Sequence, residues 1–132
     1  MTKKFGIKTK NRVELIDITA LVQKAVQESG IAEGTCTVFI PHTTAGVTIN
    51  ENADPDVVRD IEMHLAKLVP EHGGFRHGEG NSDSHIKALF TGASLTVIVD
   101  RNKLLLGTWQ GIYFCEYDGP RDRQFYVNTI AG

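Results

Sequence analysis

The hydrophobic period changes once in the first quarter of the chain. Residues 5–10 and 12–18 alternate between apolar and polar side chains, and this period of two is typical of strands. After the second strand, apolar residues recur three and four positions apart, which places them on one stripe of a helix. Thr19 is suited to be the N-cap of this helix and Gly30 to end it. The pattern therefore predicts two strands followed by a helix over 20–29.

The next segment predicts a pair of strands and a second helix. Residues 34–40 and 46–50 are rich in β-branched side chains, which favour strands. Asp54 and Pro55 are typical of a helix start, because an aspartate side chain accepts free N–H groups and proline needs no acceptor. An apolar stripe continues from there to Pro70, where the helix is expected to end.

Residues 71–83 have no apolar period and are rich in glycine, histidine and charged side chains. A long loop without secondary structure is uncommon in a compact domain and often carries function. Ser84 is then suited to cap a short helix over 85–90, which Gly92 would close. We therefore expect an exposed functional loop between two helices.

The last third predicts strands only. Residues 94–100 are nearly all β-formers, and Asn102 can adopt the positive φ of a tight turn. Residues 104–118 are predicted to form one long strand bent at a glycine, and 123–130 a final strand. The predicted order is β-β-α-β-β-α-α-β-β-β, an α+β fold with a largely antiparallel sheet.

Composition narrows the class of protein. The 132 residues suit one domain, 1–132, and 41% apolar content is enough for a core without disulfides. A net charge of −2 argues against binding to duplex nucleic acid. Cys36 and Cys115 lie in apolar strands and are expected to be buried, inert thiols. Neither a signal-peptide core nor an apolar stretch of about 18 residues occurs, so we expect a cytoplasmic location away from membranes.

Three histidines lie in expected loops or at a helix start: His42, His77 and His85. Three imidazoles suit zinc or a similar ion and leave a position open for water or substrate. The familiar zinc spacings, such as H-E-x-x-H, are absent, so histidines that are hydrogen-bonded or on the surface are the alternative. His64 and His72 are expected to be solvated.

Charged residues occur in the same segments. Glu51 follows a strand and Asp83 lies in the glycine-rich loop, and either carboxylate could act as a general base if desolvated. Arg121 and Arg123 are suited to forked contacts with phosphate, and Lys87 adds a cation near a helix start. A phosphorylated ligand is therefore permitted, and ordinary solvated charges are the alternative.

Most of these candidates fall in three segments, 41–54, 71–87 and the turn that holds Arg121. In a compact fold the three segments could converge on one cleft, which we expect here. Trp109 lies between two glycines of a predicted strand, and it is either a core residue or a surface for a flat ligand.

Four ordered motifs, HTTAGVTINENADPDVVRDIE, HGEGNSDSHIKALFTGASLTV, GTWQGI and GPRDR, together resemble the YjbQ family of secondary thiamine-phosphate synthases. The resemblance covers nearly the whole chain. It implies a mostly antiparallel, β-sandwich-like sheet with about three helices packed on one side, assembled as a homotrimer with clefts at subunit boundaries. It also implies a weak or promiscuous transferase that condenses hydroxymethylpyrimidine diphosphate with thiazole phosphate and releases pyrophosphate. The alternative is a metal- and phosphometabolite-binding protein with another role.

The resemblance also implies roles for particular residues. Glu51, Asp83 and His85 are the expected catalytic residues. A divalent metal, zinc or magnesium, is expected on His42, His77 and His85, and no organic cofactor is expected. The expected substrate-binding residues are Thr43, Asn50, Asn52, Lys87, Trp109, Gln110, Arg121 and Arg123. The expected partners are a small phosphorylated metabolite and further copies of this chain, with neither nucleic acid nor membrane.

Overall fold

Two antiparallel sheets and three helices make up the computed structural model, which describes residues 1–132. The strands are β1 (Thr2–Lys8), β2 (Glu14–Asp17), β3 (Gly34–Phe39), β4 (Ala45–Glu51), β5 (Ser94–Asp100), β6 (Lys103–Leu104), β7 (Gln110–Glu116) and β8 (Asp122–Ala131). The helices are α1 (Thr19–Ser29), α2 (Pro55–Leu68) and α3 (Ser82–Thr91). One sheet has the order β1-β8-β3-β5-β6 and the other β2-β7-β4. The predicted α+β fold with antiparallel strands is confirmed.

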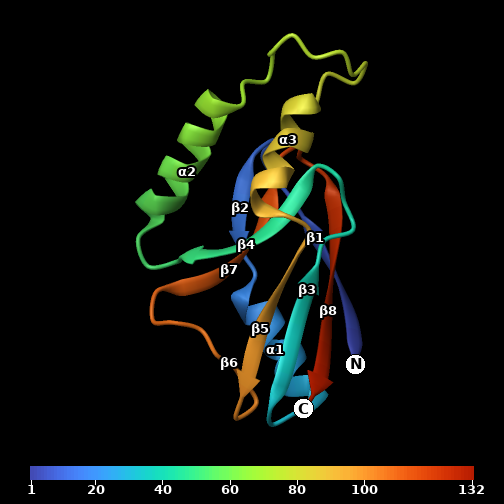
Figure 1. Ribbon diagram of the computed structural model, residues 1–132, viewed down its shortest axis with the longest axis vertical. Helices are drawn as coiled ribbons and strands as arrows, with labels where there is room; N and C mark the ends of the chain where they lie inside the picture. Colours follow the sequence, from blue (N-terminus) through green and yellow to red (C-terminus); the bar gives the residue numbers. More distant parts are fainter.

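The main core lies between the two sheets, and β7 is buried on both of its faces. Ile112 and Phe114 point into the main core, where they join the buried side of α1. Tyr113, Cys115 and Tyr117 point the other way and pack against α2 and α3. The helices therefore do not form one layer: α1 packs mainly against β6 and β8 of the large sheet, whereas α2 and α3 pack against the outer face of the small sheet (Figure 1).

The predicted long strand over 104–118 is instead two strands in different sheets. Between them the Gln110 side chain accepts a hydrogen bond from the Gly107 backbone N–H at 2.8 Å, while the Gln110 N–H donates to the Gly107 carbonyl at 3.1 Å. These two bonds close a tight turn that carries the chain from the large sheet to the small one. The turn leaves Trp109 62% exposed, so this side chain is not part of the core.

Two of the three predicted helix starts shift in the structure. Ile18 rather than Thr19 occupies the N-cap of α1, and the Thr19 hydroxyl instead accepts the Ile112 N–H at 2.8 Å. Asn81 rather than Ser84 precedes α3, and the buried Ser84 hydroxyl donates to the Tyr117 carbonyl. In both places the hydroxyl makes a tertiary contact, which sequence periodicity does not reveal.

The remaining helix boundaries agree with their predicted causes. The Asp54 carboxylate accepts the Asp56 N–H at 2.9 Å, and Pro55 begins α2. Gly30 ends α1 with a φ of 70°. Asn102 takes a φ of 61° in the turn before β6. None of the three helices is long and apolar enough to cross a membrane.

Three loops meet near the start of α3 and position the candidate site (Figure 1). They are the segment between β3 and β4, the exposed segment between α2 and α3, and the turn between β7 and β8. Hydrogen bonds join them: Asn81 donates to Asp118 at 2.7 Å, and the Tyr117 N–H donates to the Thr44 carbonyl at 3.1 Å. Segments far apart in the sequence thus form one end of the molecule.

Candidate functional site

A polar hollow of about 440 Å³ lies where the three loops meet. Its lining residues are Pro41, His42, Thr43, Thr44, His77, Glu79, Asn81, His85, Arg121 and Arg123. His42, His85 and Arg121 come from three different loops or elements, so the predicted convergence of distant segments is confirmed for these residues. The hollow combines imidazoles with two guanidinium groups, and both types of group bind anions.

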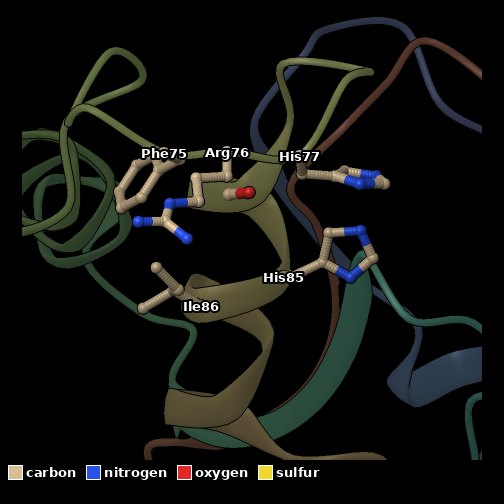
Figure 2. A pocket seen from close by; sticks show the side chains of 6 residues that line it. Phe75, Arg76, His77, His85 and Ile86 are labelled. Carbon is tan, nitrogen blue, oxygen red and sulfur yellow. The ribbon is translucent and has the colours of Figure 1, made fainter.

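His77 and His85 face each other at the edge of this hollow. Their ring centroids lie 5.6 Å apart, and the ring planes are nearly perpendicular, at 85°. Figure 2 shows His77 on the loop above and His85 on α3 below, with both rings on the same side of the helix. His85 also lines two further hollows, of about 470 Å³ and about 530 Å³. His85 therefore lines three adjacent hollows.

The His42 side chain takes the place of a backbone hydrogen bond that the large sheet lacks at Pro41. Phe39 pairs with Tyr126, so an extended ladder would place Pro41 opposite Gln124, but proline has no N–H to donate. The His42 ring takes this place: its Nε2 lies 2.9 Å from the Gln124 backbone nitrogen and 3.1 Å from the Gln124 carbonyl oxygen, and the tautomer decides whether it accepts from the N–H or donates to the carbonyl. A neutral ring that accepts the N–H carries its proton on Nδ1, and one that donates to the carbonyl carries it on Nε2. His42 is thus held by the sheet, with Nδ1 as its remaining polar atom.

The pKa of His42 is lowered from its ordinary value. Partial burial of the ring is the main cause, and the nearby Arg123 guanidinium is the second. Both disfavour the charged imidazolium. At neutral pH the ring is therefore uncharged and carries a single N–H.

Arg123 is anchored by a buried carboxylate beneath the hollow. Its Nε donates to Glu116 at 2.7 Å, and its Nη2 donates to the Thr44 hydroxyl at 2.8 Å. No protein atom accepts from its Nη1, so this nitrogen is free to bind a ligand. Arg121 is half-exposed and pairs with Asp118 at 2.9 Å. The two arginines form the cationic side of the site.

Asp83 and Lys87 do not reach the hollow. The fully buried Asp83 carboxylate accepts two hydrogen bonds from Arg12, each at 3.0 Å, and one from Lys87 at 3.0 Å. Burial alone would raise the pKa of Asp83, but the hydrogen bonds from Arg12 and Lys87 outweigh it and lower the pKa. The carboxylate is therefore ionised and fully occupied, and it ties α3 to the loop before β2. A general-base role for Asp83 would require this network to open.

The other predicted site residues lie at the far end of β4. Asn50 and Glu51 end that strand, and Asn52 follows it, where its N–H donates to the Trp109 carbonyl at 2.9 Å. Gln110 pairs with Glu51 across the small sheet. A strand rises about 3.3 Å per residue, so β4 separates this group from the hollow by roughly 20 Å. One chain does not bring the two groups together.

A metal ion fits part of the histidine cluster. Two imidazoles that share one zinc ion have ring centroids about 5 to 6 Å apart, which suits the His77 and His85 rings. The buried Asn81 Oδ1 has no hydrogen-bond partner, and an amide oxygen is a suitable cation ligand. No three His, Cys, Asp or Glu side chains are grouped closely enough to hold an ion in this arrangement. The three-histidine site stays a prediction.

Sequence reasoning missed several residues that shape the site. Asn81 lines the polar hollow, and Glu116 anchors Arg123 from below. Asn81 precedes an apolar helical stripe, so helix-capping rules could have identified it. Glu116 lies in an apolar strand, where a lone acidic residue is itself a signal of a buried ion pair.

Comparisons with known proteins find similar sequences over nearly the whole chain. A sequence model described as "UPF0047 protein YjbQ-like" matches residues 3–132. The chain is 53% identical over 131 residues to UPF0047 protein MJ1081 of Methanocaldococcus jannaschii, with 99% of this chain and 95% of that protein covered. It is 53% identical over 132 residues to YugU of Bacillus subtilis, with 99% and 100% covered.

Two crystal structures share the fold. An uncharacterised YjbQ/UPF0047 protein from Clostridium acetobutylicum has a TM-score of 0.96 and 57% identity, with 97% of this chain and 99% of that one covered. A protein of unknown function from Sulfolobus solfataricus has a TM-score of 0.95 and 32% identity, with 100% and 97% covered.

Proposed function

The chain belongs to the YjbQ-like UPF0047 family, and from that premise we propose that it is a weak thiamine-phosphate synthase. In this reaction the C–O bond between the pyrimidine methylene and the diphosphate breaks. The thiazole nitrogen forms a C–N bond to the same methylene carbon, and pyrophosphate leaves. The observation that carries the proposal is the polar hollow, in which His42 and His85 lie beside Arg121 and Arg123.

The chemistry needs charge stabilisation more than it needs a base. Negative charge develops on the leaving pyrophosphate, and preorganised donors stabilise such charge in the transition state. Arg123 Nη1 and the Arg121 guanidinium are the donors of the hollow, and His42 adds an Nδ1–H in the tautomer whose Nε2 accepts the Gln124 N–H. A divalent ion, where bound, would neutralise further charge on the diphosphate. His77, His85 and the Asn81 oxygen are the residues that fit it.

We extend the proposal to a homotrimer whose subunits complete one another's sites. Leu89 and Phe90 of α3 are 80% and 61% exposed, and α2 buries no residue completely within one chain. Exposed apolar side chains in this number are typical of subunit interfaces. A neighbouring copy could bring its Glu51 and Trp109 to the histidine hollow, which one chain keeps apart.

The test is an assay of the protein purified from a host that lacks its own thiamine-phosphate synthase. We expect thiamine phosphate to form and kcat/KM to fall roughly 100-fold in Arg121→Ala and His85→Ala. Arg59→Ala is the matched control, because Arg59 is an exposed arginine of α2 outside every hollow described. Unchanged rates in both site variants would contradict the assignment.

A second candidate is a metal- and phosphometabolite-binding protein with another role. The locked Asp83 carboxylate favours it, because a residue expected to be catalytic is held by Arg12 and Lys87 and does not line the hollow. Tight stoichiometric binding of a phosphorylated metabolite with negligible turnover would support this candidate. The same preparation would then show bound metal by elemental analysis, and a higher melting temperature with added zinc.

A further inference from the structure

A second hollow, of about 530 Å³, lies over the first turn of α3. Six residues line it: Phe75, Arg76, His77, Ser82, His85 and Ile86 (Figure 2). It shares the facing imidazoles of His77 and His85 with the polar hollow, but none of its other lining residues. None of the six residues is acidic, so nothing in the lining repels an anion.

Arg76 is the free cation of this second hollow. It forms no ion pair, whereas Arg121 and Arg123 of the polar hollow pair with Asp118 and Glu116. Figure 2 shows its guanidinium beside the Phe75 ring and turned toward Ile86, on the opposite side of the hollow from the two imidazoles. A guanidinium with all five donors available is well suited to bind phosphate.

The rest of the lining suits a flat apolar group. The Phe75 ring packs over Gly73, where a Cβ atom would lie only 2.7 Å from it, and the ring remains 41% exposed. Ile86 presents an aliphatic surface on the next turn of the helix. Ser82 adds a hydroxyl that makes no hydrogen bond within the protein and can donate to a phosphate oxygen. The second hollow is therefore lined both by groups that bind anions and by apolar groups.

We infer that this hollow is a second ligand site, which takes a small phosphate monoester with an aromatic ring. The phosphate binds Arg76 and the Ser82 hydroxyl, and the ring lies against Phe75 and Ile86. The role of the site as the place of a second reactant rests on the proposed function. Two phosphorylated molecules would then bind on either side of the His77–His85 pair, one at Arg76 and one at Arg121 and Arg123.

Phenyl phosphate is a suitable probe, titrated into the intact protein by calorimetry at fixed ionic strength. We expect two equivalents to bind per chain. Arg76→Gln should remove one equivalent and leave the other, and Arg121→Gln should weaken only the one that Arg76→Gln leaves. Phe75→Ala should weaken phenyl phosphate several-fold at the second site without changing the affinity for inorganic phosphate. Arg59→Gln is the control for loss of an exposed, unpaired arginine.

The outcomes separate this inference from the proposed function. Two equivalents with no thiamine-phosphate formation would support the second site and contradict the synthase. A single equivalent that Arg76→Gln leaves unchanged would overturn the second site, whatever the turnover. An equal loss of phenyl phosphate affinity in Arg76→Gln and Arg59→Gln would also overturn the second site. The loss would then follow from the change in net charge alone.

Discussion

Glu116 and Arg123 form a buried ion pair directly beneath the histidine hollow. The Glu116 carboxylate is fully buried and accepts hydrogen bonds from Arg123, from the Thr9 hydroxyl at 2.9 Å and from the Asp118 N–H at 2.9 Å. Burial alone would raise the pKa of Glu116, but these bonds outweigh it and lower the pKa. The cationic side of the proposed site is thus rigid because its supporting carboxylate is saturated.

Glu116→Gln should destabilise the protein by about 3–5 kcal/mol at pH 7, because it leaves the Arg123 charge buried without its partner. The pH dependence has a definite sign. Since folding lowers the pKa of Glu116, its contribution is complete above the ordinary value of 4.5 and is lost as the pH falls through the lower, folded pKa. Denaturant unfolding across this acid range should show a weaker pH dependence in the variant than in the parent.

The double variant Glu116→Leu/Arg123→Met is the control for this prediction. It removes both charges, so it should cost less stability than Glu116→Gln alone. Equal losses in the two variants would show that volume rather than charge decides the stability of this position.

At the scale of elements, the approach of α3 to β4 decides where His85 lies. The C-terminal end of the helix crosses the strand at Gly46, where a Cβ atom would lie 2.2 Å from the Thr91 hydroxyl and 2.7 Å from the Gly92 carbonyl. The Val47 N–H also donates to the Gly92 carbonyl at 3.1 Å. Only glycine at this position lets the helix lie so close to the sheet.

Gly46→Ala should therefore push α3 outward and cost roughly 1–3 kcal/mol of stability. Because His85 lies on the same helix, the affinity for a phosphorylated ligand should fall as well. Thermal unfolding and ligand titration measure the two effects. Gly6→Ala is the matched control, since Gly6 is also a strand glycine and a Cβ atom there meets nothing within 4 Å. If both variants behave like the parent, the close approach is not needed.

At the scale of the whole molecule, the candidate residues form two groups at opposite ends of β4. The histidines and arginines lie at its start, and Asn50, Glu51 and Asn52 lie at its end with Trp109 (Figure 1). The exposed apolar side chains of α3 make a neighbouring copy the natural source of the missing half. The homotrimer and the shared site remain one joint proposal.

Complementation between inactive variants tests the shared site. Glu51→Ala and Arg121→Ala should each reduce synthase activity to about 1% of the parent in a pure trimer. When the two chains are co-expressed in equal amounts, about a quarter of the sites should combine an intact Glu51 from one chain with an intact Arg121 from the next. The same fraction of the parent activity should return. No recovery from trimers shown to be mixed would place both residues in one chain's site or outside the site.

The boundaries of most elements could be predicted because they depend on neighbours in the chain. Asp54 and Pro55 start α2, and Gly30 ends α1, through local backbone chemistry. The break between β6 and β7 could not be predicted, because the Gln110 side chain makes the turn and the two sheets then separate its flanking strands. The period of the apolar residues indicates the type of element and its buried face. It does not indicate that two neighbouring strands belong to different sheets.

The sequence by itself determined the order of the elements and which segments are rich in histidine, arginine and amide side chains. Only the tertiary structure decided which of these side chains share a space. His42, His85 and Arg121 meet because the loops around the start of α3 are tied together, whereas Asp83 is locked by Arg12, a residue far away in the chain. Such pairings depend on contacts between distant segments, and no local pattern encodes them.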